Sequence, residues 1–424
     1  MRSSHSPYRF HYWAIALPVA AIALVFPVYA VLEPEPVFGS ELLRWTAYGI
    51  LGGVGFSLIR YVLLYGREWA KGTVLSLLSF VLVYLLLEAV CGLVLRWRAG
   101  TPTATPPPPN RANDLRLIRD ERLGTFRPAP GRYATVYPAA PAAQPNGQPT
   151  NARRPVTVTY HIDSLSRRVT PFDSHRAAGR YALFLGCSFT YGEAVADTNT
   201  LPYYFGRETG FRPYNYGVSG QSPAHVLALL QTRNLRREVA EPDGIAVYTY
   251  IGDHLARTTP STFWAHNANG FLPSVDPVTG VVDGSYAQKH PVRMRLIHWM
   301  YRSNVVKLFR ISFPKRYRSE QYRRFVGIVQ KAKERYQRQF GNDRFYVVVF
   351  PLYPMAPELR QLFQGANLRV VDYSTLPEWD TTYDGLHPDG KAYEQVARRL
   401  AADVAPPPNQ PVARLPRTAA GSGR

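Results

Sequence analysis

The segment YALFLGCSFTYG, residues 181–192, joins an apolar run to a glycine and a serine. Five apolar residues in succession are typical of a strand that is buried on both faces of a parallel sheet. Gly186 allows the backbone to turn sharply where this strand ends. The turn would place Ser188 at the carboxyl end of the strand, where open α/β sheets bind ligands. A serine after a strand is usually only a helix cap, so this segment alone does not establish catalysis.

A second motif, DGLHPDG at residues 384–390, places an acid three residues before a histidine. Pro388 suits the start of a helix, so the motif is expected in a turn that leads into a helix. Together, the G-x-S after a first strand and the D-x-x-H before a last helix resemble the SGNH (GDSL-type) hydrolase superfamily. The resemblance covers about residues 178–403.

Between the two motifs, apolar strand patterns alternate with helix patterns. Further strands are expected at 214–217, 244–251, 345–350 and 368–371, and helices after Thr200 and Ser222 and at about 291–312, 319–340 and 391–404. This alternation predicts a parallel sheet with helices on both faces. The expected fold is therefore α/β, a flavodoxin-like three-layer α/β/α sandwich, as in the SGNH hydrolase fold. Residues 256–291 are expected to form a long irregular insertion rich in aromatic residues.

Three apolar stretches in the first hundred residues, 14–32, 45–65 and 73–95, are each long enough to cross a bilayer as a helix. A signal peptide explains the first stretch less well, because two more follow it. An odd number of spans puts the two ends of the chain on opposite sides. A small excess of Lys and Arg favours a cytoplasmic amino terminus. These stretches predict a multi-pass protein of the cell inner membrane with an extracytoplasmic, periplasmic catalytic domain.

The chain is therefore expected to have four parts: a three-helix transmembrane anchor (1–100), a proline-rich linker with an irregular collar (101–155), the hydrolase-like domain (156–405) and a disordered basic tail (406–424). Prolines at 102–109 favour a stiff, extended spacer. The β-branched alternation of 156–163 predicts a strand.

The composition limits the classes of partner and cofactor. The formal net charge is +20, from 50 Lys and Arg against 30 Asp and Glu, which could favour nucleic acid, anionic headgroups or acidic glycans. No helix-turn-helix, zinc finger or basic-aromatic RNA motif is present in the sequence, so we expect no nucleic-acid partner. The sequence also has no phosphate loop, dinucleotide fingerprint or metal-ligand spacing, so no cofactor and no metal are expected. Its two cysteines, Cys91 and Cys187, are not expected to form a disulfide.

The resemblance implies that Ser188 attacks an ester carbonyl, that His387 takes its proton and that Asp384 orients His387. The physical requirement is general, because a serine hydroxyl is a poor nucleophile until a neutral base removes its proton. Cys187 is a weaker candidate, since strand alternation turns it towards the core. An α/β-hydrolase elbow would need a glycine at position 190, which is Thr190.

The resemblance also implies an oxyanion hole made by a serine amide, a glycine amide and an asparagine side chain. Ser188 would supply the first and Gly217, in the pattern N-x-G-x-x-G at 215–220, the second. Gly217 could equally serve an ordinary tight turn. The third block departs from the pattern, because IGDHL at 251–255 puts His254 at the asparagine position. A neutral imidazole can donate one hydrogen bond. His254 could also be a surface histidine, and Asp253 is the competing occupant.

We therefore expect a membrane-anchored serine esterase that removes acyl groups, such as O-acetyl groups, from an extracytoplasmic glycan or related ester. Trp264 and Tyr191 are the expected substrate contacts. The substrate would be an acylated small molecule or a polysaccharide, with partners in a glycan assembly system. Two alternatives stay open: an O-acyltransferase that uses the same acyl-enzyme, and a non-catalytic glycan-binding or assembly module whose altered third block signals lost activity.

Overall fold

The computed structural model describes residues 59–61, 64–65, 67–100, 115–137, 156–351, 353–376, 380–382 and 385–405. The chain divides into two compact units, Met1–Leu93 and Val94–Arg424. The first predicted span, most of the second, the proline-rich linker at 101–110 and the basic tail at 406–424 lie outside the described residues.

The third predicted span is confirmed as a helix, α3 (Glu68–Gly100). Its segment Ser79–Trp97 is 19 residues long and apolar enough to cross a membrane, and it is the one such helix in the part of the chain that the structure describes. Glu88 is the only charge between Leu75 and Leu95, and it accepts a hydrogen bond from the Tyr84 hydroxyl one turn earlier at 3.0 Å. The described residues therefore show one candidate membrane-spanning helix and do not show the predicted three-helix anchor.

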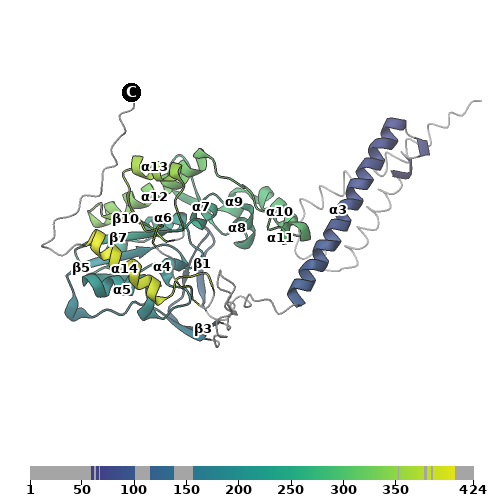
Figure 1. Ribbon diagram of the computed structural model, residues 1–424. Coiled ribbons are helices and arrows are strands. Elements are labelled where there is room, and N and C mark those ends of the chain that lie inside the picture. Colours follow the sequence, from purple (N-terminus) through teal and green to yellow (C-terminus); the bar gives the residue numbers. More distant parts are fainter. Residues whose placement is uncertain are drawn as a thin grey trace, which may run out of the picture. The chain divides into compact units, whose positions relative to one another are not determined.

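Five parallel strands form the central sheet of the second unit, as predicted (Figure 1). Their order across the sheet is β11 (Arg369–Asp372), β10 (Phe345–Val349), β7 (Asp243–Tyr250), β5 (Arg180–Leu185) and β6 (Arg212–Asn215). The run that the sequence placed first, β5, pairs with β7 on one side and with β6 on the other. Its carboxyl end therefore lies between the ends of two neighbouring strands.

The apolar run in β5 is buried on both faces because helices cover both sides of the sheet. Tyr181, Leu183 and Leu185 point into one core, and Ala182 and Phe184 point into the other. This division explains why the strand has a continuous apolar pattern and does not alternate with polar residues.

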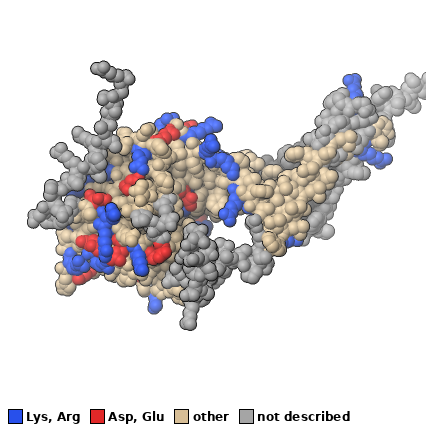
Figure 2. All heavy atoms as spheres, in the orientation of Figure 1, with Lys and Arg blue, Asp and Glu red and all other residues tan. Residues whose placement is uncertain are grey.

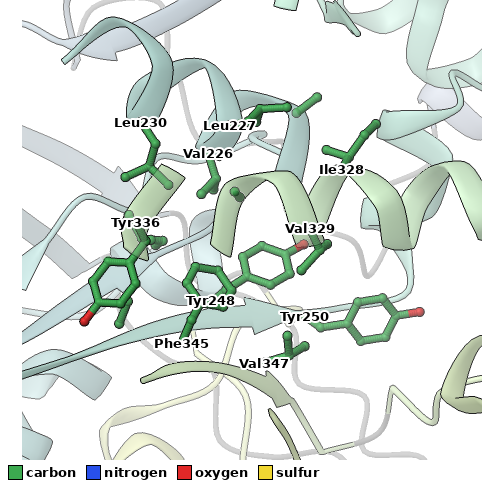
Figure 3. Close-up of a cluster of buried hydrophobic side chains, with 14 of the residues drawn as sticks. Val226, Leu227, Leu230, Tyr248, Tyr250, Ile328, Val329, Tyr336, Phe345 and Val347 are labelled. Carbon is green, nitrogen blue, oxygen red and sulfur yellow. The ribbon is translucent and has the colours of Figure 1, made fainter. Parts of the chain in front are cut away.

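Two helical layers enclose the sheet and complete the three-layer α/β/α sandwich. One layer contains α6 (Pro223–Thr232), α12 (Ser319–Phe340) and α13 (Pro357–Gly365), and the other contains α5 (Leu201–Thr209) and α14 (Gly390–Val404). Figure 3 shows Val226 and Leu230 of α6 with Val329 of α12 above Tyr248 of β7. The predicted helix starts are confirmed for α5, where the Thr200 side chain accepts from the Tyr203 amide at 3.3 Å. Proline in the first turn also begins α6.

The predicted irregular insertion is wrong, because short elements order it. Within 256–291 these are α7 (Asp253–Thr258), α8 (Thr262–Asn267), β8 (Pro273–Val275), β9 (Val282–Ser285) and α9 (Tyr286–Lys289), each too short for its periodicity to be evident in the sequence. They continue into α10 (Pro291–Met300) and α11 (Asn304–Leu308). They share a small core of Leu272, Tyr286, Met294 and Ile297. The single helix expected at 291–312 is two helices, because Ser303 caps a second helix start by accepting from the Val306 amide at 3.3 Å.

The collar expected to be irregular contains two antiparallel ladders instead. β1 (Leu117–Asp120) pairs with β2 (Thr125–Pro128), and β3 (Gly131–Tyr137) pairs with the predicted strand β4 (Val156–Ile162). The sequence of β1 to β3 lacks a clear apolar alternation, so these strands depend on pairing with a partner strand, which is nearby for β1 and β2 and about 20 residues further along the chain for β3. Through Tyr137 and Tyr160 the second ladder packs on Tyr191, directly after the serine turn.

Arg168 forms hydrogen bonds to residues 191–197, the segment that follows the serine turn. Its buried guanidinium donates to Asp197 at 2.9 Å, to the Tyr191 carbonyl at 2.8 Å and to the Val195 carbonyl at 2.6 Å. The same group lies 4.6 Å from the ring centroid of Tyr160, so it also ties the collar to the sheet domain. A charged group this buried is tolerated because its donors are satisfied.

We expect Arg168→Met to lower the free energy of unfolding by about 3–5 kcal/mol, because it leaves Asp197 and the carbonyls partly unpaired. Urea unfolding measures the change. Arg212→Met is the matched control, since Arg212 is about half exposed and pairs with Glu241 at 3.7 Å. The control should cost less than about 1 kcal/mol. Equal losses in the two variants would contradict the role of Arg168 as a buried clamp.

Candidate active site

Ser188 begins α4 (Ser188–Tyr191) directly beyond the carboxyl end of β5. The turn between them depends on Gly186, whose φ is 148°. A Cβ atom on Gly186 would lie 2.5 Å from the Thr249 hydroxyl and closer still to that of Thr190. These two hydroxyls hydrogen-bond to each other and close the space above the glycine. Only glycine fits at this position, and the turn that it allows places Ser188 directly beyond the end of the sheet.

His387 comes to the same turn from the carboxyl-terminal end of the domain. Its imidazole is buried, and the ring centroids of His387 and Phe189 are 5.1 Å apart. A bridge between Thr381 and Pro388 holds the loop, and the His387 carbonyl accepts from the Thr382 amide at 2.8 Å. Phe189 directly follows Ser188, so this ring contact brings the two sequence motifs to one place in the fold.

Asp384, the predicted orienter of His387, lies outside the described residues. The sequence prediction for its role therefore stays a prediction.

Gly217 lies against the backbone of α4. A Cβ atom here would be 2.5 Å from the Tyr191 amide nitrogen and 2.6 Å from the Thr190 Cβ. The Gly217 N–H donates to Asn215 Oδ1 at 3.0 Å, while Asn215 Nδ2 donates to the Thr190 carbonyl at 3.1 Å. Glycine thus permits close packing beside the serine turn. Its amide could serve an oxyanion only if Asn215 released it, and this role also stays a prediction.

His254 is a buried donor rather than a surface histidine. Its exposed fraction is 0%, and its Nδ1 lies 2.6 Å from the Tyr248 hydroxyl. Burial raises the pKa of Tyr248 well above its usual value, so the phenol keeps its proton and donates to Nδ1. Burial, with Arg257 and His225 nearby, lowers the pKa of His254 well below its usual value. The imidazole is therefore neutral and carries its proton on Nε2.

Asp253, the other candidate for the third position, has a side chain that is 56% exposed and lies 3.6 Å from Arg257. Asp253 therefore faces solvent, whereas the next residue of α7, His254, is fully buried and points into the domain.

Sequence reasoning missed His225, which has the same donor character. The Ser222 amide donates to His225 Nδ1 at 3.1 Å, so the proton of the neutral ring is on Nε2. Burial, followed by the charge of Arg257, lowers the pKa of His225 to about 3. The sequence did carry a signal, because His225 is three residues after the helix cap Ser222, where a capping box places an acceptor.

Arg257 was also missed, and it supplies the positive charge of the site. Its Nη1 donates to the Gln221 carbonyl at 2.9 Å. Its guanidinium lies 4.1 Å from the Trp264 ring centroid. Burial raises the pKa of the Cys187 thiol despite the nearby Arg257, so that thiol stays protonated, consistent with the predicted packing role.

Three buried side-chain N–H groups of this region have no hydrogen-bond partner among the described residues: His225 Nε2, His254 Nε2 and Arg257 Nε. The groups come from the amino-terminal turn of α6 and from α7, beyond the ends of β6 and β7. None of the three can accept in this protonation state. Such a set suits an oxygen that is negative or becomes negative during a reaction.

The two predicted substrate contacts differ in position. Trp264 is partly buried and stacks on Arg257, so it borders the donor set. Tyr191 is buried, and its ring packs 5.3 Å from that of Tyr160. Tyr191 therefore contributes to packing rather than to a solvent-facing groove. Among the described residues, no group of three or more His, Cys, Asp or Glu could hold a metal ion.

No family model and no curated protein matches the chain. A solved structure described as a lipolytic protein of the G-D-S-L family from Desulfitobacterium hafniense DCB-2 has 11% identity and a TM-score of 0.29, covering 53% of this chain and 98% of that one. One described as an arylesterase from Agrobacterium tumefaciens str. C58 has 14% identity and a TM-score of 0.27, covering 53% and 97%. ObcA bound to oxaloacetate has 14% identity and a TM-score of 0.14, covering 44% and 38%. Scores this low do not by themselves establish a relationship.

The lowered pKa of His225 predicts acid-sensitive folding. An unfolded histidine binds its proton near pH 6.5, whereas folded His225 does so only near pH 3. The unfolded state therefore binds more protons between these values, and the free energy of unfolding falls as pH drops from 6.5 towards 3. One such histidine can change the free energy of unfolding by up to about 1.4 kcal/mol for each pH unit in this range.

Replacing His225→Gln keeps an acceptor for the Ser222 amide and removes this titration. We expect the variant to lose less free energy of unfolding than the wild type between about pH 6 and pH 4, by urea unfolding. The control His175→Gln, at an exposed position, should follow the wild type. A pH dependence unchanged in His225→Gln would show that His225 is not held neutral.

Proposed function

We propose that the protein is a serine ester hydrolase whose nucleophile is Ser188 and whose general base is His387. The observation that carries this proposal is that the Ser188 turn, with Phe189 against the His387 ring, stands at the carboxyl end of β5. These residues come from the two motifs that resemble the SGNH superfamily, almost 200 positions apart in the sequence.

In the proposed reaction, His387 removes the Ser188 hydroxyl proton as the oxygen attacks the ester carbonyl. The acyl group is transferred to Ser188 Oγ, and His387 gives the proton to the departing alkoxide. A water molecule then attacks the acyl-enzyme with His387 again acting as base, which releases the acid and restores the serine. Asp384 would hold the imidazole in the required tautomer.

The oxyanion formed at each attack needs donors that are already fixed. We assign the side-chain donor to His254 Nε2, because Tyr248 fixes the tautomer and burial keeps the ring neutral. Arg257 adds a fixed positive charge in the same region. The amide of Ser188 would complete the set.

For the substrate, we propose an acyl ester of an extracytoplasmic glycan, such as an O-acetyl group. The helix α3 supports a membrane anchor, and the partly buried Trp264 could stack on a sugar ring. The periplasmic location and association with a glycan assembly system belong to the same proposal.

Acyl transfer is a second candidate, and it is favoured by Trp264, which borders the donor set and could stack on the ring of a sugar acceptor. If a sugar hydroxyl reaches the acyl-enzyme first, the same residues transfer the acyl group. Product analysis with an added alcohol acceptor separates the two reactions.

We expect a fluorophosphonate probe to label the protein on Ser188, because Ser188 is the proposed nucleophile and the next residue, Phe189, packs against the His387 ring. Mass mapping of the labelled peptide is the measurement. Ser188→Ala should abolish labelling, whereas the control Ser219→Ala should keep it. Labelling at Cys187 or at another serine, or no labelling of a folded protein, would overturn the assignment and favour a non-catalytic module.

We expect His254→Ala to lower kcat on an aryl acetate by about 100-fold, the loss typical of one oxyanion donor, with a smaller change in KM. His254→Asn should restore much of the rate, because its amide can donate from a similar place. Circular dichroism checks that the variants fold. If the folded His254→Ala variant turned over the ester at the wild-type rate, His254 would not be an oxyanion donor.

A further inference from the structure

Residues 286–318 contain nine Lys or Arg and no Asp or Glu, although the whole chain has 30 acidic residues. The nine are Lys289, Arg293, Arg295, Arg302, Lys307, Arg310, Lys315, Arg316 and Arg318. Over α5 and α14, by contrast, basic and acidic side chains are mixed (Figure 2). This segment, which contains α10 and α11, is therefore a local source of positive potential.

The same segment exposes large apolar side chains along one face of α10. Val292, Leu296 and Trp299 are 76%, 62% and 67% exposed. Their spacing of four and three residues places them on one stripe of the helix. Met294 and Ile297 point the other way and are buried in the core of the insertion. The packing of α10 is thus already satisfied without the exposed stripe.

Two further aromatic side chains extend the apolar surface beyond α11. Phe309 and Phe313 are 62% and 50% exposed. Phe313 is fixed in this position, because the Thr262 amide donates to its carbonyl at 2.7 Å and its own amide donates to the Thr262 hydroxyl at 3.0 Å. We call Val292, Leu296, Trp299, Phe309 and Phe313 the apolar ridge.

Several cations beside the ridge are not neutralised. Arg302, Lys307, Arg310 and Lys315 are exposed and form no ion pair within the described residues. Elsewhere in the domain exposed cations do find acids, as Lys331 does with Glu334 at 2.9 Å. The ridge and its cations therefore present apolar and positive groups together.

We infer that the apolar ridge binds the surface of an anionic phospholipid bilayer. Trp, Leu and Phe bordered by Lys and Arg are the composition of segments that lie in the membrane interface, where apolar groups enter the acyl boundary and cations meet phosphates. The candidate span Ser79–Trp97 in the same chain provides a bilayer for the ridge to meet. The inference does not depend on the chemistry at Ser188.

Charge argues against a second copy of this chain as the occupant. In a symmetric pair the ridge would face its own image, and the unpaired cations beside it would meet the same cations of the second copy. An acidic protein partner has compatible charge, and the experiment below distinguishes it from lipid.

The test uses the full-length protein in nanodiscs of phosphatidylcholine, with or without phosphatidylglycerol. Leu296→Cys is labelled with a nitrobenzoxadiazole dye, whose emission shifts to the blue in an apolar setting. The natural Cys91 and Cys187 are buried, so the new thiol is labelled selectively. Val278→Cys is the matched control, because Val278 is 90% exposed and lies outside the ridge.

We expect the dye at position 296 to be blue-shifted and quenched by nitroxide-labelled lipid when phosphatidylglycerol is present, and the dye at 278 to be unaffected. Adding Lys315→Glu and Arg316→Glu should lower the ratio of docked to undocked protein about tenfold or more, since each cation near an anionic surface contributes. Equal behaviour of the two dyes would overturn the inference. A blue shift without nitroxide quenching would also overturn it, because the dye would then lie against protein and not in lipid. Retention of the chain in membranes after alkaline extraction tests the α3 anchor separately.

Discussion

The position of Ser188 depends on close approach between backbone segments at the end of the sheet. At Gly186 a side chain would collide with the Thr190 and Thr249 hydroxyls, and at Gly217 with the backbone of α4. These two contacts draw β5, β6 and β7 together where their carboxyl ends meet. Because both positions lack a Cβ atom, α4 can begin directly over the sheet, with Phe189 against the ring of His387. Arg168 then fixes the chain that leaves α4.

Burial determines the electrostatic character of the same region. Two histidines and an arginine lie together away from water, where a charge on either imidazole would be costly. Both rings are therefore neutral, and their Nδ1 atoms accept from Tyr248 and from the Ser222 amide. The remaining Nε2 protons have no acceptor among the described residues. The exclusion of water thus keeps both imidazoles neutral and leaves each of them with one fixed N–H donor.

The insertion after β7 connects this chemistry with the outer surface of the domain. Its first helix, α7, carries His254 and Arg257, and α8 and α10 pack together in its own small core. The residues that follow α7 carry the apolar ridge and the unpaired cations. If the ridge binds lipid, the donors and the bilayer contact belong to one continuous segment of the chain.

The sequence alone determined the strand β5, the alternation of strands and helices and the apolar helix α3. These features depend on local patterns: apolar runs, first-turn prolines and a glycine where a strand ends. Only the tertiary structure decided that residues 117–137 form strands, that the insertion is ordered, and that His225 and Arg257 join His254. Each of these outcomes depends on contacts between segments, such as the pairing of β3 with β4, the shared core of the insertion and the grouping of His225 with Arg257. A histidine becomes a neutral donor only when distant segments exclude water from it, and spacing in the sequence does not record that exclusion.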